Sequence, residues 1–348
     1  MFSWSSINAP IIGLSPMADM TDLPFCSVVR LVHTEGKQHR SPVMFREMVA
    51  SEAIVRGNAK TLGMARFDPI ERPLIQQIFG SEPETMARAA AIIMEKFGPD
   101  GIDINMGCPV YKLTSTFNGA ALMKEPERAS AIVRAIKAAL AGAAPLSVKI
   151  RLGWGDPTQA REFGKILEDA GADLITVHGR TKCQAYSGKA DWNEIGEIKK
   201  GVSIPVLANG DIVDGATALR ALEASGADGV MVGRGALGNP WVFGEIAVAL
   251  RCHPEQSEES RDSSLAAQND KLYRSPLKEK ISVILHHAEL MVEHYGPHGI
   301  VLFRKHLSWY LKRFAGSKPL RARLMKVQTL DELKTIFASH NILTFSSL

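Results

Sequence analysis

The chain has 348 residues, of which 45% are hydrophobic and 22% are charged, and its formal net charge is +4. Such a chain can bury a large core, and its length favours one large domain with a smaller one. No stretch approaches the roughly 20 apolar residues of a membrane-spanning helix, and residues 1–8 lack the pattern of a secretion signal. We therefore expect a cytoplasmic protein without membrane contact.

Short β-rich runs alternate with helical segments through the first 250 residues. Eight runs have the composition of strands, namely 11–17, 42–48, 74–79, 102–106, 146–150, 174–178, 205–208 and 230–233. The segments of helical composition that alternate with them are 22–33, 51–62, 83–97, 126–141, 158–170, 192–200, 214–225 and 240–250. Eight β/α units in about 250 residues predict an α/β fold, a closed (β/α)8 TIM barrel over residues 1–250.

The remainder of the chain has a different character. Residues 251–275 are largely polar and rich in Ser and Glu at their start, which predicts a disordered linker or insertion. Residues 276–348 show apolar side chains at helical spacing and predict a small C-terminal helical domain of three or four helices. Residues 271–348 contain thirteen Lys or Arg against five Asp or Glu, so this tail carries a net charge of +8. A basic tail suggests a polyanionic partner, although exposed helices are also often lysine-rich.

The four cysteines must be judged one by one. Cys26, Cys108, Cys183 and Cys252 form no CxxC pair, so we expect neither a disulfide framework nor a zinc site, and no other metal site is indicated. Cys108 lies between glycine and proline just after a predicted strand, and these neighbours hold the thiol in a defined place. A thiol is mostly protonated at neutral pH and can act as an acid. The alternative is a buried structural cysteine.

Active sites of TIM barrels gather at the carboxyl ends of the strands, so the polar residues there are the natural candidates. The predicted strand ends carry Ser15 to Ala18, Gln77, Asn105 to Pro109, Lys149 and Arg151, His178 and Arg180, Asn209 to Asp211, and Gly233 to Gly235. The last two ends suit a phosphate, since glycines let backbone N–H groups approach it and Arg234 adds positive charge. Residues 233–238 also match GxGxxG, but no further strand follows to complete a Rossmann unit.

Lys149 would be a costly charge in a barrel mouth unless it met a partner. A reduced flavin is anionic along its N1 to C2-carbonyl edge and would supply one. Gln77 and His178 could form hydrogen bonds to the same ring. Taken singly, each residue has another explanation: a solvated lysine, a histidine bonded within the core, or a glutamine that caps backbone. Their occurrence together at matching strand ends favours the flavin site.

Motifs spread over nearly the whole chain resemble those of the tRNA-dihydrouridine synthases, in the same order. They are Ser15-Pro-Met-Ala18, Asp103-Ile-Asn-Met-Gly-Cys-Pro109, Val148-Lys-Ile-Arg-Leu-Gly-Trp154, Thr176-Val-His-Gly-Arg-Thr181, Tyr186-Ser-Gly-Lys-Ala-Asp-Trp192, Ile204-Pro-Val-Leu-Ala-Asn-Gly-Asp-Ile212, Val232-Gly-Arg-Gly-Ala236 and Arg304-Lys-His-Leu-Ser-Trp-Tyr-Leu-Lys312. The resemblance implies a barrel with FMN at its mouth, a helical domain that helps to bind tRNA, and reduction of uridine to 5,6-dihydrouridine by NADPH or NADH.

The resemblance also implies roles for particular residues. Cys108 matches the proton donor, which would protonate C5 of the uracil after hydride from flavin N5 reaches C6. Asn105 and Arg180 match positions that face the base. The residues expected around FMN are Pro16, Met17, Ala18, Gln77, Lys149, His178, Asn209, Gly210, Asp211, Gly233 and Arg234.

A uridine in folded tRNA must leave its stack to enter a barrel mouth, so the enzyme must hold the RNA backbone. In the basic tail, Lys305 and Lys312 are spaced to share one helix face, as are His306 and Arg313, and this helix could track phosphates. No obligate protein partner is evident.

Two other functions remain open at this point. An FMN barrel that acts on a free pyrimidine, such as a dihydroorotate or dihydropyrimidine dehydrogenase, would share the fold and the acid but would not need the basic helical tail. A non-catalytic RNA-binding barrel would keep the tail and bind no flavin. The flavin content and the substrate of the purified protein separate the three.

Overall fold

The computed structural model describes residues 2–7, 9–34, 41–251, 277–312 and 318–339. The chain divides into two compact units. The barrel unit comprises residues 1–22 and 42–233, and the helical unit comprises residues 23–41 and 234–348. The expected disordered linker at 251–275 lies, apart from its first residue, outside the described residues. The domain limits expected at residues 250 and 276 therefore stay a prediction.

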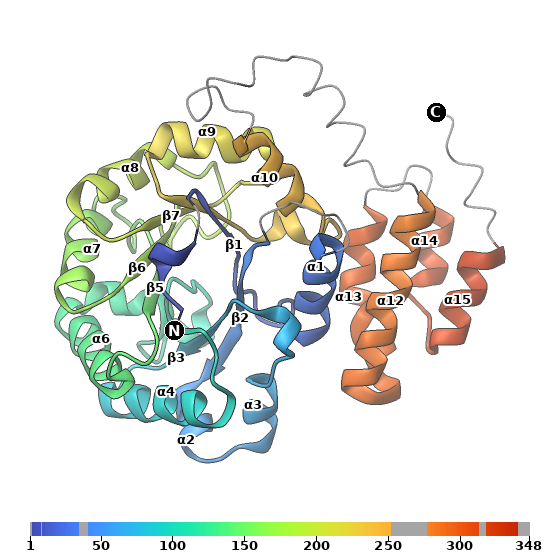
Figure 1. The fold of residues 1–348 in the computed structure, drawn as a ribbon, viewed down its shortest axis with the longest axis horizontal. Helices are drawn as coiled ribbons and strands as arrows, with labels where there is room; N and C mark the ends of the chain where they lie inside the picture. The colour runs from blue at the N-terminus through green and yellow to red at the C-terminus, as the bar shows by residue number, and fades with distance from the viewer. Residues whose placement is uncertain (1, 8, 35–40, 252–276, 313–317, 340–348) are drawn as a thin grey trace. The chain divides into compact units, whose positions relative to one another are not determined.

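The barrel unit contains a closed, fully parallel sheet in which each strand pairs with the next and the last with the first. Its strands are β1 (Ile11–Leu14), β2 (Val43–Ala50), β3 (Leu74–Phe79), β4 (Gly101–Met106), β5 (Leu146–Arg151), β6 (Leu174–His178), β7 (Val206–Asn209) and β8 (Gly229–Val232). The strands are buried almost throughout, as expected when both faces of a parallel sheet are covered. The predicted eight-stranded barrel is confirmed (Figure 1).

Helices alternate with the strands of the barrel unit (Figure 1). They are α2 (Ser51–Val55), α3 (Ala59–Met64), α4 (Pro83–Phe97), α5 (Tyr111–Thr114), α6 (Pro126–Leu140), α7 (Gln159–Asp169), α8 (Trp192–Gly201) and α9 (Gly215–Ser225), with 3-10 turns η1 (Trp4–Ser6), η2 (Pro69–Glu71) and η3 (Gly119–Lys124). The single helix expected at 51–62 is wrong. Gly57 has a φ of 71°, which ends α2, and the side chain of Asn58 accepts a hydrogen bond from the Thr61 N–H to start α3.

The barrel interior is packed with side chains from most of the strands. One buried cluster combines Trp4 with residues of the strands, and the ring of Trp4 stacks on Phe45. The guanidinium of Arg46 and the carboxylate of Glu71 form a buried ion pair at 2.8 Å. This packed interior gives the strand ends a rigid base.

The helical unit is built from α1 (Leu23–Thr34) and the C-terminal helices. The latter are η4 (Arg234–Ala236), α10 (Val242–Arg251), α12 (Leu277–Tyr295), η5 (Gly296–His298), α13 (Gly299–Leu311), α14 (Lys318–Leu324) and α15 (Leu330–Ser339). A common core joins α12 to α15 and includes Met291, Phe303, Leu307 and Phe337. The expected C-terminal helices are thus present. Among the described residues, no helix is long and apolar enough to cross a membrane.

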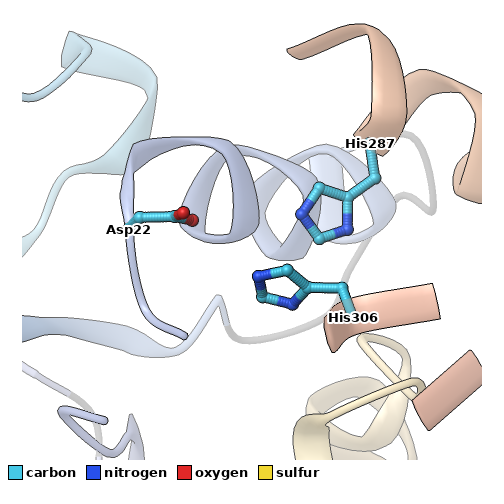
Figure 2. A group of neighbouring side chains, drawn as sticks. All are labelled: Asp22, His287 and His306. Carbon is cyan, nitrogen blue, oxygen red and sulfur yellow. The ribbon is translucent and has the colours of Figure 1, made fainter. Parts of the chain in front are cut away.

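Two histidines face each other inside the helical unit. His287 of α12 and His306 of α13 place their ring centroids 4.6 Å apart (Figure 2). The ring of His306 also stacks on Phe25 of α1, and Nδ1 of His287 lies 3.1 Å from the Tyr310 hydroxyl oxygen. Burial lowers the pKa of His287 to about 3 and holds the pKa of His306 well below its usual range, with the nearby Lys305 adding to both effects. Both rings are therefore neutral at physiological pH.

Burial of His306 corrects one expectation from the sequence. The helix face that carries His306 points into the core and cannot contact phosphates, because its imidazole is only 2% exposed. Its predicted companion Arg313 lies outside the described residues. On the other proposed face, which carries Lys305 and Lys312, Lys312 is exposed. Its ammonium lies 3.5 Å from the centroid of the Trp309 ring.

The neutral histidines predict acid sensitivity. Since the folded pKa values lie below the unfolded value, the unfolded chain binds more protons below about pH 6.5, and each buried histidine then lowers the free energy of unfolding by up to about 1.4 kcal/mol per pH unit. Stability is fully present above this pH and is lost as the pH falls. Urea titrations between pH 7 and 5 should show this slope. His306→Phe keeps an aromatic ring and should flatten it; an equally steep slope in the variant would contradict the assignment.

Candidate active site

The carboxyl ends of the strands lie on one rim of the closed parallel barrel, and most of the predicted site residues lie there. Pairing between strands sets Asn105 of β4 opposite Lys149 of β5, and His178 of β6 opposite Asn209 of β7. Polar side chains expected from the sequence are therefore neighbours around this rim. The contacts between them form three groups.

The first group links β3 and β4 to the loop that carries Cys108. The Gln77 amide nitrogen donates to a carboxylate oxygen of Asp103 at 2.6 Å, and the Gln77 amide oxygen accepts from the Asn105 amide nitrogen at 2.9 Å. The Asn105 amide oxygen accepts from the backbone N–H groups of Gly107 and Cys108 at 3.2 and 2.9 Å. Asn105 thus holds the backbone of Cys108, and Gln77 in turn holds the side chain of Asn105.

The loop around Cys108 is fixed from further directions. Arg151, which is 2% exposed, donates from Nε to the Gly107 carbonyl oxygen at 2.8 Å and from a terminal nitrogen to the Thr181 carbonyl oxygen. The Cys108 carbonyl oxygen accepts from the Ala120 N–H at 3.1 Å. The thiol itself is free and half-buried. Backbone bonds on both sides therefore hold Cys108 on the rim, where the residue is partly exposed.

The second group contains the ammonium of Lys149. It donates to the Asn209 amide oxygen at 3.0 Å, and the Asn209 amide nitrogen donates to the Met231 carbonyl oxygen at 2.7 Å. Burial lowers the pKa of Lys149 to about 8, helped by the positive charge of Arg151 and opposed by Asp103 and Cys108. Lys149 has no carboxylate within ion-pair distance in the described part of the chain. Its ammonium therefore remains poorly compensated within the protein.

The third group is centred on Arg180. Its guanidinium forms an ion pair with Asp211 at 2.6 Å and donates to the carbonyl oxygens of Ser187 and Gly188. A terminal nitrogen also lies 3.2 Å from Nε2 of His178. Gly210 has a φ of 114°, and a side chain there would meet Ala190 at 2.8 Å. Arg180 therefore organises the loop after β6, and its predicted contact with the base stays a prediction.

The segment after β1 lies beside the end of β8. The Met17 N–H donates to the Thr21 hydroxyl at 2.8 Å, and a side chain at Gly233 would lie 3.7 Å from the Met17 sulfur. Pro16 and Met17 are half-buried, and Ala18 is exposed. Arg234 is exposed, opens η4 and belongs to the helical unit, so its predicted approach to a phosphate stays a prediction.

The sequence alone gives no role to two residues that the structure places in the site, Asp103 and Arg151. Asp103 lies in the middle of β4 and reads as part of a buried strand, yet it is the acceptor at the end of the Gln77 chain. Arg151 stands at a predicted strand end, but nothing in the sequence shows that it donates a hydrogen bond to the Gly107 carbonyl oxygen. A charged residue inside an otherwise apolar strand is the one signal that could have singled out Asp103, because such a charge needs partners.

A family model for dihydrouridine synthases matches residues 13–345 of the chain. A probable tRNA-dihydrouridine synthase 1 of Synechocystis sp. is 37% identical over 324 residues, which cover 92% of this chain and 84% of the relative. A probable tRNA-dihydrouridine synthase of Rhodobacter capsulatus is 39% identical over 324 residues, covering 91% and 90%.

Among solved structures, histamine dehydrogenase from Rhizobium sp. 4-9 aligns with a TM-score of 0.54 and 12% sequence identity. The alignment covers 96% of this chain and 62% of that one, and it shows a shared fold alone. The family match, in contrast, spans the barrel strands, the Cys108 loop and the C-terminal helices. The chain therefore belongs to the dihydrouridine synthase family, a family of oxidoreductase enzymes.

Proposed function

We propose that this protein reduces uridines of tRNA to 5,6-dihydrouridine, with FMN as its cofactor and NADPH as the electron donor. The observation that carries the proposal is the placement of the Cys108 loop and the Lys149 ammonium at adjoining ends of β4 and β5. Cys108 offers an acid and Lys149 offers a cation at the same rim. The names of the relatives support tRNA as the substrate.

The residues at the rim fit an anionic flavin edge. The Lys149 ammonium has three N–H groups, and one of them is bonded to Asn209, its hydrogen-bond acceptor among the described residues. A half-buried cation with N–H groups to spare favours an anionic or strongly accepting partner. His178 on the adjoining strand β6 and Gln77 on β3 add polar groups, so the donor set suits the N1 to C2-carbonyl edge of FMN.

The chain's own residues would then complete the reaction. Bound FMN would supply a hydride, which adds to C6 of the uracil because the C5–C6 double bond is conjugated with the C4 carbonyl. Cys108 would donate its thiol proton to C5, leaving a thiolate that solvent reprotonates. Asn105, whose amide oxygen holds the Cys108 loop, would face the base beside it. Lys149 would stabilise the reduced cofactor electrostatically.

The remaining predicted residues would shape the cofactor site. Asn209 orients the Lys149 ammonium, and Gly210 and Asp211 form the loop that Arg180 ties to β6. We propose Pro16, Met17, Ala18, Gly233 and Arg234 as the residues around the flavin on the β1 and β8 side. The exposed Lys312, which caps the C-terminal end of α13, would contact the tRNA backbone, whose phosphates dominate affinity for basic proteins.

A single absorbance experiment tests the proposal. The purified protein should show flavin absorbance that bleaches with anaerobic NADPH and recovers when unmodified tRNA is added, with dihydrouridine appearing in the RNA. Recovery with free uracil or orotate instead of tRNA would identify a free-pyrimidine enzyme. A protein that binds tRNA in a salt-sensitive way but takes up no FMN would contradict the enzymatic proposal. NADH in place of NADPH in the same experiment tests the electron donor.

A further inference from the structure

A continuous chain of hydrogen bonds joins a buried carboxylate to the backbone of Cys108. It runs from Asp103 through the side-chain amide of Gln77 and that of Asn105 to the Cys108 N–H, over links of 2.6, 2.9 and 2.9 Å. The side chain of Ser147 donates to the other oxygen of the Asp103 carboxylate at 2.6 Å. All of the side chains in this chain are buried, with Asp103 fully so.

The direction of this chain is fixed at both ends. A backbone N–H can only donate, so the atom of Asn105 that faces Cys108 must be its amide oxygen. An ionised carboxylate can only accept, so the atom of Gln77 that faces Asp103 must be its amide nitrogen. With both ends set, the Asn105 nitrogen meets the Gln77 oxygen at 2.9 Å, and a donor meets an acceptor at every link. Rotating either amide by half a turn would create two like-with-like contacts.

The carboxylate of Asp103 is suited to this task at neutral pH. Burial raises its pKa to about 6, while the hydrogen bonds from Ser147 and Gln77 and the charge of Lys149 lower it. It is therefore ionised under physiological conditions. Buried hydrogen-bond networks in which every member is satisfied hold their side chains in one arrangement, whereas a network with a missing member does not.

We propose that Asp103 is a positioning residue which, through Gln77 and Asn105, sets the orientation of the Asn105 amide and the place of the Cys108 loop. This inference rests on the proposed role of Cys108 in the reaction, and it adds a residue that touches neither substrate nor cofactor. It assigns Gln77 a second task beside the flavin. Without the carboxylate, Gln77 loses the acceptor that orients it, and the Asn105 nitrogen no longer meets a fixed acceptor, so the Asn105 amide holds the Cys108 loop less firmly.

Hydrogen exchange of the Cys108 amide tests the proposal directly. Asp103→Leu removes the acceptor but keeps a buried side chain of similar size. In the full-length protein, NMR should then show the Cys108 and Gly107 amides exchanging roughly tenfold faster relative to the amides of β4, as expected for the loss of one buried hydrogen bond. Asp103→Asn still offers an oxygen to Gln77 and should retain most of the protection. An unchanged Cys108 exchange rate in Asp103→Leu would overturn the proposal.

Ser147→Ala is the matched control. It removes the other hydrogen bond to the same carboxylate and leaves the link from Asp103 to Gln77 in place, so the Cys108 amide should keep its protection. Equal loss in Ser147→Ala and Asp103→Leu would show that the carboxylate acts only through general stability, against the proposal. If Asp103→Leu does not fold, Gln77→Met interrupts the chain at its next link, and a normal Cys108 exchange rate there would overturn the proposal equally.

Kinetics provide a second readout. Asp103→Leu should slow reoxidation by tRNA by about tenfold, the same loss of one hydrogen bond, and should slow reduction by NADPH less, because Asn105 and the Cys108 loop act only on the base. The exchange measurement needs neither flavin nor tRNA. Failure of the unaltered protein to form dihydrouridine would thus contradict the proposed function and leave the test of Asp103 intact.

Discussion

Cys108→Ala is expected to stop dihydrouridine formation while leaving the flavin half of the reaction intact. The variant should bind FMN and bleach with NADPH, because the thiol sulfur is not among the groups that hold the cofactor in our proposal. Its reoxidation by tRNA should slow by at least about 100-fold, the usual contribution of a positioned general acid. The measurement is stopped-flow absorbance of the reduced protein mixed with tRNA, with the dihydrouridine content determined in the same samples.

Cys183→Ala is the matched control for this variant. It removes the same group from an exposed thiol in the loop after β6, and it should leave both half-reactions unchanged. If Cys108→Ala forms product at a near-normal rate, another group supplies the proton and the assignment of Cys108 is wrong. If its flavin no longer bleaches with NADPH, the thiol serves the cofactor rather than the base.

Lys149→Met is expected to weaken FMN binding by roughly tenfold to a hundredfold, since it removes a hydrogen bond from a charged donor. The methionine keeps an unbranched side chain one atom shorter and removes the cation that lies beside Asn209. Because the pKa of Lys149 is lowered to about 8, the affinity of the apoprotein for FMN should also fall as the pH rises through this value, as the ammonium is lost. Fluorescence quenching of free FMN on titration with apoprotein measures both effects.

Lys200→Met removes the same charge from the surface of α8, where the lysine is 75% exposed, and should leave FMN binding unchanged. Full flavin affinity in the Lys149→Met variant would refute the placement of Lys149 at the flavin. A uniform loss in both variants would instead point to net charge rather than to a specific contact.

Sequence periodicity predicted the barrel well because each strand of a parallel sheet is a short apolar run between helices. The strands at 74–79 and 174–178 were predicted with their observed limits. The break between α2 and α3 was missed, although the Gly57-Asn58 pair is a turn signal, because the helical pattern on either side dominates a longer window.

The site was predictable only in part for a related reason. Strand ends can be read from the sequence, so Gln77, Lys149 and His178 could be assigned to one rim. The partners of these side chains depend on residues far along the chain, as Arg180 and Asp211 or Arg151 and Gly107 show. Whether an amide presents its oxygen or its nitrogen to a given neighbour is decided by packing and by distances that periodicity does not contain.

The closed barrel also bears on how this enzyme could acquire new targets. Every strand has two paired neighbours, so the sheet has no open edge at which another chain could add, and its integrity does not depend on the rim loops. The segment after β4 presents exposed Val110 and, at the start of α5, exposed Tyr111, and the loop after β6 presents exposed Tyr186. Such loops can lengthen or change side chains one at a time. Target choice can therefore evolve loop by loop on a scaffold that keeps its fold unchanged.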